Sequence, residues 1–334
     1  MKRDIITFLL MIASQQSIAL EYTLTASPIL AYNAVDGVIL GAALFYYPEK
    51  KLEKSESASL RFLANKDKHD KAIIDYKKLA SNETYGFALS ASFDNFDYAE
   101  YDDASSSEYQ MVSAERFNFK PQILLPSSQH HEWSLFFDLR QRDENPIKNE
   151  QLSSDETFRY SIGMDYQISD LDDNLNPTSG SLQKISVSVL PSQNTLLSTA
   201  AVDIDLRHYY QLSKYIIGAS RLSAGIYSAQ PGYLFRYQLG GEEGLRGFDA
   251  NRFYGKKFYL LQQELRFPIW RIVEGVAFVE AGEAASSHFK QHRTVTGLGV
   301  RIGLPPDFRM KLRVDYAFDD EQQSALLVNF GHFF

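Results

Sequence analysis

Apolar and polar residues alternate along much of this chain with a period of two. Within residues 158–168, aromatic and aliphatic residues fill the even positions, and arginine, serine, glycine, aspartate and glutamine fill the odd ones. Similar alternation recurs in residues 201–210 and 308–318. A period of two puts the apolar side chains on one face of a β-strand and the polar ones on the other. The pattern predicts an all-β protein, although a strand of a soluble sandwich would share it.

The polar face of residues 308–318 is highly charged. It carries Arg309, Lys311, Arg313 and Asp315 on alternate positions. So many charges on one strand face require water or one another. A barrel with a hydrated interior provides both.

Counting such segments yields sixteen candidate strands, an even number, as bacterial outer-membrane barrels have. These strands start near Tyr22, Asp36, Ser57, Asp70, Glu83, Glu108, His131, Glu156, Gly180, Leu197, Lys214, Lys256, Ile272, His292, Phe308 and Ser324. Short connections at Ser81-Asn82, Trp270-Arg271 and residues 305–307 alternate with long ones at residues 94–107, 143–155 and 228–255. Short periplasmic turns and longer external loops alternate in this way in a transmembrane barrel. The prediction is a 16-stranded antiparallel transmembrane β-barrel with residues 228–255 as its sixth extracellular loop.

The first nineteen residues have the features of a secretory signal peptide. Lys2 and Arg3 precede an apolar stretch, and Ser17-Ile18-Ala19 has the small-x-small pattern of a cleavage site. An amphipathic first helix kept in the mature protein is the alternative. Since no later segment offers the roughly eighteen apolar residues of a membrane-spanning helix, any span must belong to a closed barrel. We expect a signal peptide over residues 1–19 and a barrel over residues 20–334, with no periplasmic domain.

Composition narrows the chemistry. The net charge of −8 and the lack of a basic patch argue against a nucleic-acid partner. The absence of cysteine excludes disulfides and thiolate metal sites, and it suits a chain that crosses an oxidising periplasm. No catalytic motif is present, and the histidine clusters His130-His131 and His288 with His292 lack partners at metal-ligand spacing. We therefore expect no metal, no cofactor and no enzymatic activity.

The most distinctive segment is a glycine-rich run around one arginine. Gly240, Gly241, Gly244 and Gly247 fall within eight residues and surround Arg246. Glycines allow positive φ and close backbone approach, so this loop can fold tightly and carry a fixed charge into a narrow space. Because the interior of a sixteen-stranded barrel is too wide for its own side chains to fill, the loop is the natural plug.

Leu245, Arg246, Gly247 and Phe248 resemble the Val/Leu-Arg-Gly-Phe/Tyr substrate-loop motif of the BamA-like superfamily, also called the bacterial surface antigen family. These outer-membrane barrels insert or secrete proteins. Three more elements match in order: a turn at residues 172–180, a strand at residues 258–268, and residues 278–282, which are similar to a Phe-x-Asp-x-Gly element. The resemblance covers residues 158–334, and a generic surface loop of another barrel is the alternative.

The resemblance implies a specific plug contact. Arg246 would enter the lumen and pair with Glu280, which stands where the family has aspartate, on an inward face shared with Phe278 and Gly282. It also implies insertion or translocation of a polypeptide client, or of a lipid, at the outer membrane of a Gram-negative bacterium. Family members usually carry periplasmic domains before the barrel. Here a periplasmic partner protein or a homodimer would replace them, in contact with outer-membrane lipids.

The two ends of the chain carry further signals. Phe330 and Phe334, on one face with Leu326, are similar to the terminal aromatic signal for barrel insertion. Pro28 cannot donate to a strand ladder and Gly331 weakens the last strand, so a seam between the first and last strands would open sideways, as the family's lateral gate does. The alternative is that strand one starts after Pro28 and closes normally.

Aromatic residues near predicted strand ends are expected to form girdles at the bilayer interfaces. They are Tyr46, Tyr47, Tyr209, Tyr210 and Trp270.

Two other functions remain open. A passive plugged channel or a structural barrel would need no client. An outer-membrane phospholipase would need a serine–histidine arrangement, which the sequence lacks.

Overall fold

The structure, a computed structural model, describes residues 22–33, 37–48, 56–65, 70–101, 109–128, 130–146, 158–192, 195–241, 244–304, 308–309, 311–330 and 334. The predicted signal peptide at residues 1–19 and Gly331 lie outside these ranges. Within them, no helix is long and apolar enough to cross a membrane.

Long antiparallel strands make up most of the described chain. They are β1 (Tyr22–Asn33), β2 (Gly37–Pro48), β3 (Glu56–Asn65), β4 (Asp70–Lys78), β5 (Gly86–Tyr101), β6 (Tyr109–Leu125), β7 (His131–Pro146), β8 (Phe158–Ser169), β9 (Gly180–Ser192), β10 (Thr195–Gln211), β11 (Ile217–Tyr227), β14 (Lys257–Trp270), β15 (Val273–Ala285), β16 (Arg293–Gly303), β17 (Lys311–Asp319) and β18 (Ser324–Phe330). Between β11 and β14, the turn η1 (Tyr233–Phe235) precedes a small two-stranded sheet of β12 (Tyr237–Leu239) and β13 (Phe253–Gly255).

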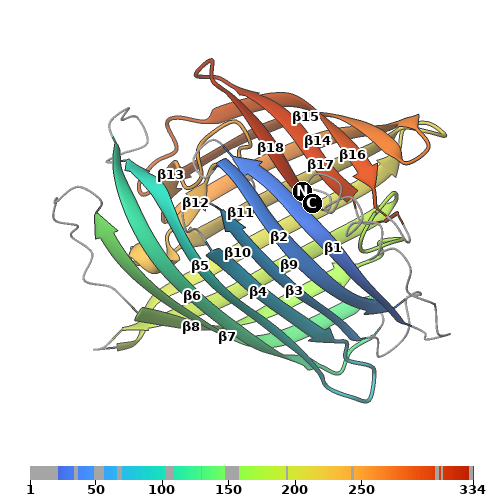
Figure 1. The fold of residues 1–334 in the computed structure, drawn as a ribbon. Helices are drawn as coiled ribbons and strands as arrows, with labels where there is room; N and C mark the ends of the chain where they lie inside the picture. The colour runs from blue at the N-terminus through green and yellow to red at the C-terminus, as the bar shows by residue number, and fades with distance from the viewer. Residues whose placement is uncertain are drawn as a thin grey trace.

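Neighbouring long strands pair in the barrel order β1-β18-β17-β16-β15-β14-β11-β10-β9-β8-β7-β6-β5-β4-β3-β2 (Figure 1). Among the described residues, Tyr32 opposite Val328 is the register pair that joins β1 to β18. The predicted all-β, antiparallel class is confirmed. Each predicted strand start lies within three residues of an observed one.

Two predicted connections were placed too early. β5 continues through Tyr101 and β7 through Pro146, so residues 94–101 and 143–146 belong to strands. These strands are 16 residues long, well beyond the 9 to 11 that cross a bilayer. Backbone pairing continues past the apolar band because a strand ladder needs hydrogen-bond partners, whatever its side chains are.

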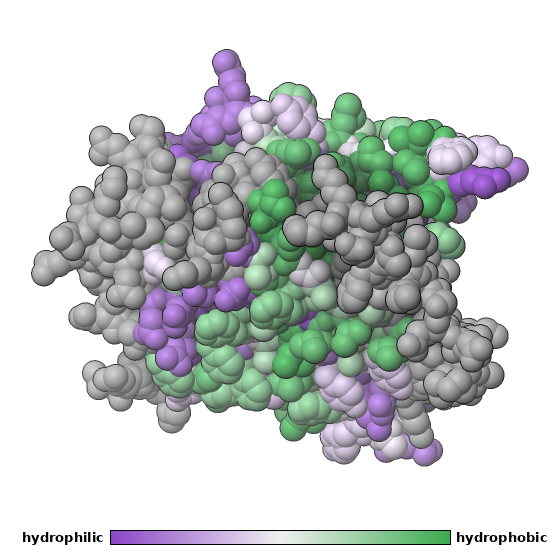
Figure 2. Space-filling model, in the orientation of Figure 1, coloured by the Kyte–Doolittle hydropathy of each residue, from purple (hydrophilic) through white to green (hydrophobic). Residues whose placement is uncertain are grey.

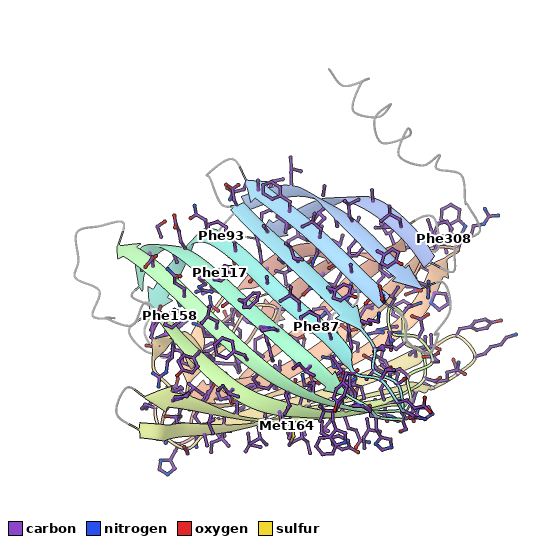
Figure 3. All side chains as sticks on the ribbon, turned by 90° about the horizontal axis from the view of Figure 1, so that it is seen from below. Phe87, Phe93, Phe117, Phe158, Met164 and Phe308 are labelled. Atoms are coloured by element: carbon purple, nitrogen blue, oxygen red, sulfur yellow. The ribbon has the colours of Figure 1, made fainter. Side chains whose placement is uncertain are left out.

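The two faces of the strands are inverted relative to a soluble protein. On β8, Ser161 and Asp165 are buried, while Phe158, Ile162 and Met164 are 54%, 49% and 39% exposed. Figure 2 shows apolar residues over much of the visible outer surface, and Figure 3 shows exposed phenylalanines of β5, β6 and β8. A soluble sandwich would bury the apolar face, so that alternative is wrong.

The charged face of β17 points into the barrel. Lys311, Arg313, Asp315 and Asp319 are all buried, whereas Phe318 is 49% exposed. The charges pair with residues of other strands; for example, Lys311 Nζ lies 2.7 Å from Glu274 Oε1 on β15, two strands away. Inward charges therefore satisfy one another.

One girdle residue and one terminal residue depart from the alternation. Tyr209 is only 2% exposed and packs inside the barrel, with its ring centroid 6.3 Å from that of Phe334. Phe334 is buried with Leu171 and Ala219, whereas Leu326 faces outward. Arg266 Nη2 donates to the carbonyl oxygen of Phe334 at 3.1 Å, which fixes this inward position. The expected shared face of Leu326 and Phe334 is therefore wrong; Phe330 is in β18, and its side chain is outside the described atoms.

The turn between β8 and β9 is organised by two carboxylates. Asp172 Oδ1 accepts the backbone amides of Asp173, Thr178 and Ser179 at 3.0, 2.9 and 3.1 Å. Asp173 Oδ1 accepts the amides of Leu175 and Asn176. Burial raises the pKa of Asp172, but hydrogen bonds from Thr178, Ser179 and Asp173 outweigh it and hold the pKa below its ordinary value.

The pKa of Asp172 is lower in the folded protein than the ordinary aspartate pKa of about 3.9. Its carboxylate should therefore stabilise the β8–β9 turn at pH values above about 3.9, and this stabilisation should be lost as the pH falls below that value. We expect the amides of Thr178 and Ser179 to lose protection from hydrogen exchange as the pH falls below about 4, after correction for intrinsic rates. Asp172→Asn, which cannot titrate, should show lower protection without this pH dependence. Equal pH profiles for parent and variant would contradict this account.

Candidate functional site

Residues 228–241 and 244–256 lie inside the ring of strands and contact both of its sides. On one side, Arg140 Nη1 of β7 donates to the carbonyl oxygen of Leu234 at 3.2 Å, and the Tyr237 hydroxyl donates to Asp203 of β10. On the other side, Arg246 reaches β14, β15 and β17. The segment thus spans the interior.

An apolar cluster holds the second half of this segment against the wall. Leu239, Leu245, Phe248 and Phe253 from the segment are 6% exposed or less. They pack with wall residues of β14 to β17, namely Leu260, Val276, Phe278, Ala284, Val295 and Ala317. The Phe248 and Phe253 rings meet edge to face, 4.9 Å apart. Apolar burial therefore sets the position of the backbone at Leu245, directly before Arg246.

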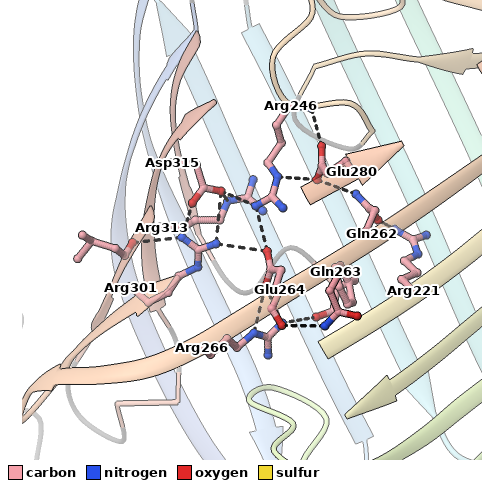
Figure 4. A network of polar contacts seen from close by, with 12 residues as sticks. Arg221, Arg246, Gln262, Gln263, Glu264, Arg266, Glu280, Arg301, Arg313 and Asp315 are labelled. Atoms are coloured by element: carbon pink, nitrogen blue, oxygen red, sulfur yellow. Dashed lines mark hydrogen bonds and ion pairs between the residues drawn. The ribbon is translucent and has the colours of Figure 1, made fainter. Parts of the chain in front are cut away.

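Arg246 is fully buried and is bound by three carboxylates (Figure 4). Its Nε donates to Glu280 Oε1 at 2.7 Å, and its backbone amide donates to Glu280 Oε2 at 2.9 Å. Its Nη1 donates to Glu264 Oε1 at 3.0 Å and to Asp315 Oδ2 at 2.8 Å. These charge-assisted hydrogen bonds fix both the side chain and the backbone at this position.

Strand register brings the carboxylates together. Gln262 and Glu264 of β14 lie opposite Glu280 and Phe278 of β15, all on the inward face. Gln262 Nε2 also donates to Glu280 Oε1 at 3.0 Å. Asp315 comes from β17, two strands away from Glu280, so the site depends on three strands.

Other arginines complete the network. Arg266 Nε donates to Glu264 Oε2 at 3.1 Å. Arg301 of β16 donates from both terminal nitrogens to Asp315, and Arg313 Nε lies 3.6 Å from Asp315 Oδ2. Glu280 differs from the other two carboxylates, because Arg246 is the cation that contacts it in the described part of the chain.

Burial alone would lower the pKa of Arg246, but Glu280, Glu264 and Asp315 raise it above its ordinary value. The guanidinium thus stays charged at any physiological pH. Arg246 is thus a permanent cation held by the carboxylates of Glu280, Glu264 and Asp315, and we call this set of contacts the clamp.

An aromatic ring and two glycines shape the space around the clamp. The guanidinium carbon of Arg246 lies 3.5 Å from the centroid of the Phe278 ring, a cation–π contact. A Cβ on Gly297 of β16 would lie 2.2 Å from Phe278 Cζ, and a Cβ on Gly299 would lie 2.0 Å from Asp315 Oδ1. Glycine at these two positions makes room for the side chains that hold Arg246.

The glycines of the run have different roles. Gly240 and Gly241 have φ of +114° and +78°, which residues with a Cβ rarely adopt. A Cβ on Gly247 would lie 3.0 Å from Asp319 Cβ, so this glycine permits close approach to β17. Gly244 has no positive φ, and Gly282 faces Leu239.

The structure therefore brings Arg246, Glu280 and Phe278 together, with Leu245 and Phe248 packed beside them. Sequence reasoning missed Glu264, Asp315 and Arg301. Two of these residues could have been predicted from the sequence. Alternation along β14 puts Glu264 on one face with Gln262, and Asp315 is one of the charged residues of β17. No pattern in the sequence around Tyr237 or Asp203 predicts the contact between these two residues.

The proposed gate residues are only partly described. Pro28 lies within β1 opposite Ala42 of β2, so the alternative in which β1 starts after Pro28 is wrong about that start. Gly331 lies outside the described residues. Across the described residues, no group of three His, Cys, Asp or Glu side chains is placed to hold a metal ion.

The profile of the Omp85 superfamily domain matches residues 15–334. The chain belongs to the Omp85 superfamily. BamA from Haemophilus ducreyi lacking POTRA domains 1-3 superposes with a TM-score of 0.63 at 12% identity, over 93% of this chain and 70% of that one. No curated protein matches the sequence significantly.

Two CdiB structures are also similar in fold. CdiB from Acinetobacter baumannii gives a TM-score of 0.58 at 13% identity, and the match covers 93% of this chain and 60% of that one. CdiB from Escherichia coli gives a TM-score of 0.61 at 11% identity, and the match covers 95% of this chain and 64% of that one. The chain thus spans less than two thirds of either CdiB chain, and identities this low establish the fold alone.

Arg246→Ala should destabilise the folded barrel by about 3–5 kcal/mol, because it leaves Glu280 buried without its cation. Glu280→Ala should cost less, about 1.5–3 kcal/mol, because Arg246 keeps Glu264 and Asp315. Thermal unfolding in detergent and heat-modifiable gel mobility measure both. Lys214→Ala, in an exposed turn, is the matched control and should change stability by less than about 0.5 kcal/mol. If the two site variants behave like the parent, the loop is not anchored by this clamp.

Gly297→Ala should cost about 1–3 kcal/mol, because the added methyl group forces the Phe278 ring away from Arg246. The displaced ring should also make residues 228–256 more sensitive to protease in detergent. The neighbouring Thr296→Ala, on the exposed outer face, should leave both measurements unchanged. Equal protease sensitivity for the two variants would show that Phe278 does not position the loop.

Proposed function

We propose that this chain is a sixteen-stranded outer-membrane barrel of a Gram-negative bacterium that inserts or translocates a polypeptide client. In this proposal, residues 1–19 are a cleaved signal peptide, and residues 228–255 are the sixth extracellular loop and plug. The contact of Arg246 with carboxylates from three wall strands carries the proposal, in a chain that belongs to the Omp85 superfamily.

The outward face of the strands supports a place in a membrane. Exposed apolar side chains such as Phe62, Leu135 and Ile185 are 53%, 47% and 47% exposed on separate strands. Exposing this much apolar surface to water is unfavourable, whereas a bilayer accommodates it. Outer-membrane lipids are therefore the first partners.

The plug divides the interior unequally. It is clamped to β14, β15 and β17, while a cavity of about 910 Å³ remains between the plug and the inward faces of β1 to β7. A client segment would pass through this space, or through the seam between β1 and β18, without release of the clamp. No cofactor is required, since folding of the client supplies the free energy.

A passive plugged channel is the second candidate, and the same cavity favours it. Seven lysine or arginine side chains line the cavity against three aspartates. A wall of this composition attracts small anions. A channel would therefore conduct steadily with a preference for anions.

Depletion of the chain combined with planar-bilayer conductance separates the two candidates. If the chain inserts or translocates a client, its depletion should remove particular outer-membrane or surface proteins. Expression of the Arg246→Ala variant should restore these proteins poorly, whereas the Lys214→Ala variant should restore them fully. An unchanged membrane proteome together with steady anion-preferring conductance would identify the channel instead.

Cysteines at Tyr32 and Val328, which form a register pair across β1 and β18, test the seam. Locking them should abolish activity if the client leaves sideways. Full activity with the seam locked would remove lateral opening from the mechanism. A periplasmic protein that copurifies with the barrel would supply the client-recruiting role that we assign to a partner.

A further inference from the structure

The outer surface of the barrel carries a group of polar side chains where apolar ones are expected. His208 of β10 lies opposite Ser220 of β11, and Ser220 lies opposite Gln263 of β14. Tyr210 follows two residues after His208 on the same face. We name these four residues the polar patch.

Burial along each strand shows that the patch points outward. On β10, Leu206 is 37% exposed and His208 is exposed, whereas Tyr209 between His208 and Tyr210 is 2% exposed. On β14, Leu261 and Leu265 flank Gln263 and are 47% and 39% exposed. Their neighbours Gln262 and Glu264 are buried inside.

Outward apolar side chains lie on both sides of the patch along the strands, although Tyr210 is the second-to-last residue of β10. On β14, Phe267 and Ile269 continue the outward apolar row toward the strand end, with 38% and 57% exposed. On β11, Ile226 toward one end is 52% exposed, and Ile216 beyond the other end is 38% exposed. A polar group in this zone lacks water to bind and requires another hydrogen-bond partner.

Contacts within the patch satisfy only part of this requirement. Ser220 Oγ donates to Gln263 Oε1, and Gln263 Nε2 donates to the Tyr210 hydroxyl oxygen at 3.2 Å. The His208 ring stacks on Tyr210 at 5.4 Å between centroids. In the described part of the chain, the nitrogens of the His208 ring form no hydrogen bond. The Tyr210 hydroxyl hydrogen and the His208 ring are thus available to a partner.

A groove of about 740 Å³ lies over the patch. The outward apolar side chains Leu206, Leu222, Leu261 and Val279 line it together with His208, Ser220 and Gln263. A partner with a similar apolar surface and a few hydrogen-bonding groups would fill it.

We propose that the polar patch is the interface through which two copies of this chain pair within the membrane. Imidazole, hydroxyl and amide groups each donate and accept hydrogen bonds, and all four side chains can be neutral. A two-fold interface brings the same surface of both copies together, so it must be self-complementary, and these groups meet that condition. Charged lipid head groups fit less well, because the nearby arginines Arg207 and Arg221 turn inward to Asp205.

Disulfide trapping tests this interface directly, since the chain contains no cysteine. His208→Cys and Ser220→Cys, each as the single cysteine in native outer membranes, should yield a covalent dimer on mild oxidation. Ile162→Cys on the outer face of β8 is the matched control, with a similarly exposed position away from the patch. We expect at least a tenfold higher dimer fraction from the patch positions than from the control. Equal fractions, or trapping of a different protein, would overturn the proposal.

A second measurement avoids reliance on crosslinking. The parent, reconstituted in lipid nanodiscs at low protein density, should give the mass of a dimer. The combined variant His208→Leu, Tyr210→Phe and Gln263→Leu should give a monomer with unchanged heat-modifiable mobility, because only outward side chains change. A parent that is monomeric, or a folded combined variant that stays dimeric, would also overturn the proposal. Neither measurement involves a client, so its outcome is independent of the transport function.

Discussion

The charge of one buried arginine organises this barrel. A guanidinium removed from water is tolerated only when carboxylates and hydrogen bonds surround it. Arg246 meets this condition through Glu280, Glu264 and Asp315, which come from three different strands. The side chain can therefore be placed only when β14, β15 and β17 are already in register. The same constraint ties a long loop to one part of the wall.

The loop is attached to both sides of the interior, but its buried ion pairs are all on one side. The apolar cluster around Leu245 and Phe248 reinforces the clamp on β14 to β17, and the β7 and β10 contacts are made by Leu234 and Tyr237 nearer the start of the loop. The remaining space lies mainly along β1 to β7, and its charged lining residues are seven lysines or arginines and three aspartates. The cavity beside the loop includes Ile29 of β1 and Asn329 of β18 in its lining, so it reaches the part of the wall next to the β1 and β18 seam.

The outer surface follows a different constraint. A strand that faces lipid must present apolar side chains, and most of the described strands do so. The polar patch on β10, β11 and β14 departs from this rule, and β14 is the strand that it shares with the clamp. A second copy bound there would contact the most firmly fixed part of the barrel and leave the β1 to β7 side free.

The sequence by itself determined the strands and their faces. Alternation is a local property of backbone geometry, so starts such as His131, Gly180 and Ser324 and the inward charges of β17 were predictable. The Arg246–Glu280 contact was predictable only through resemblance to a family motif. Glu264, Asp315 and the glycines Gly297 and Gly299 join the site through pairing of strands far apart in the chain. Tertiary structure alone decided these contacts, the inward turn of Phe334, and the lateral alignment of His208, Ser220 and Gln263, because strand register and barrel closure are set by the summed packing of the whole wall.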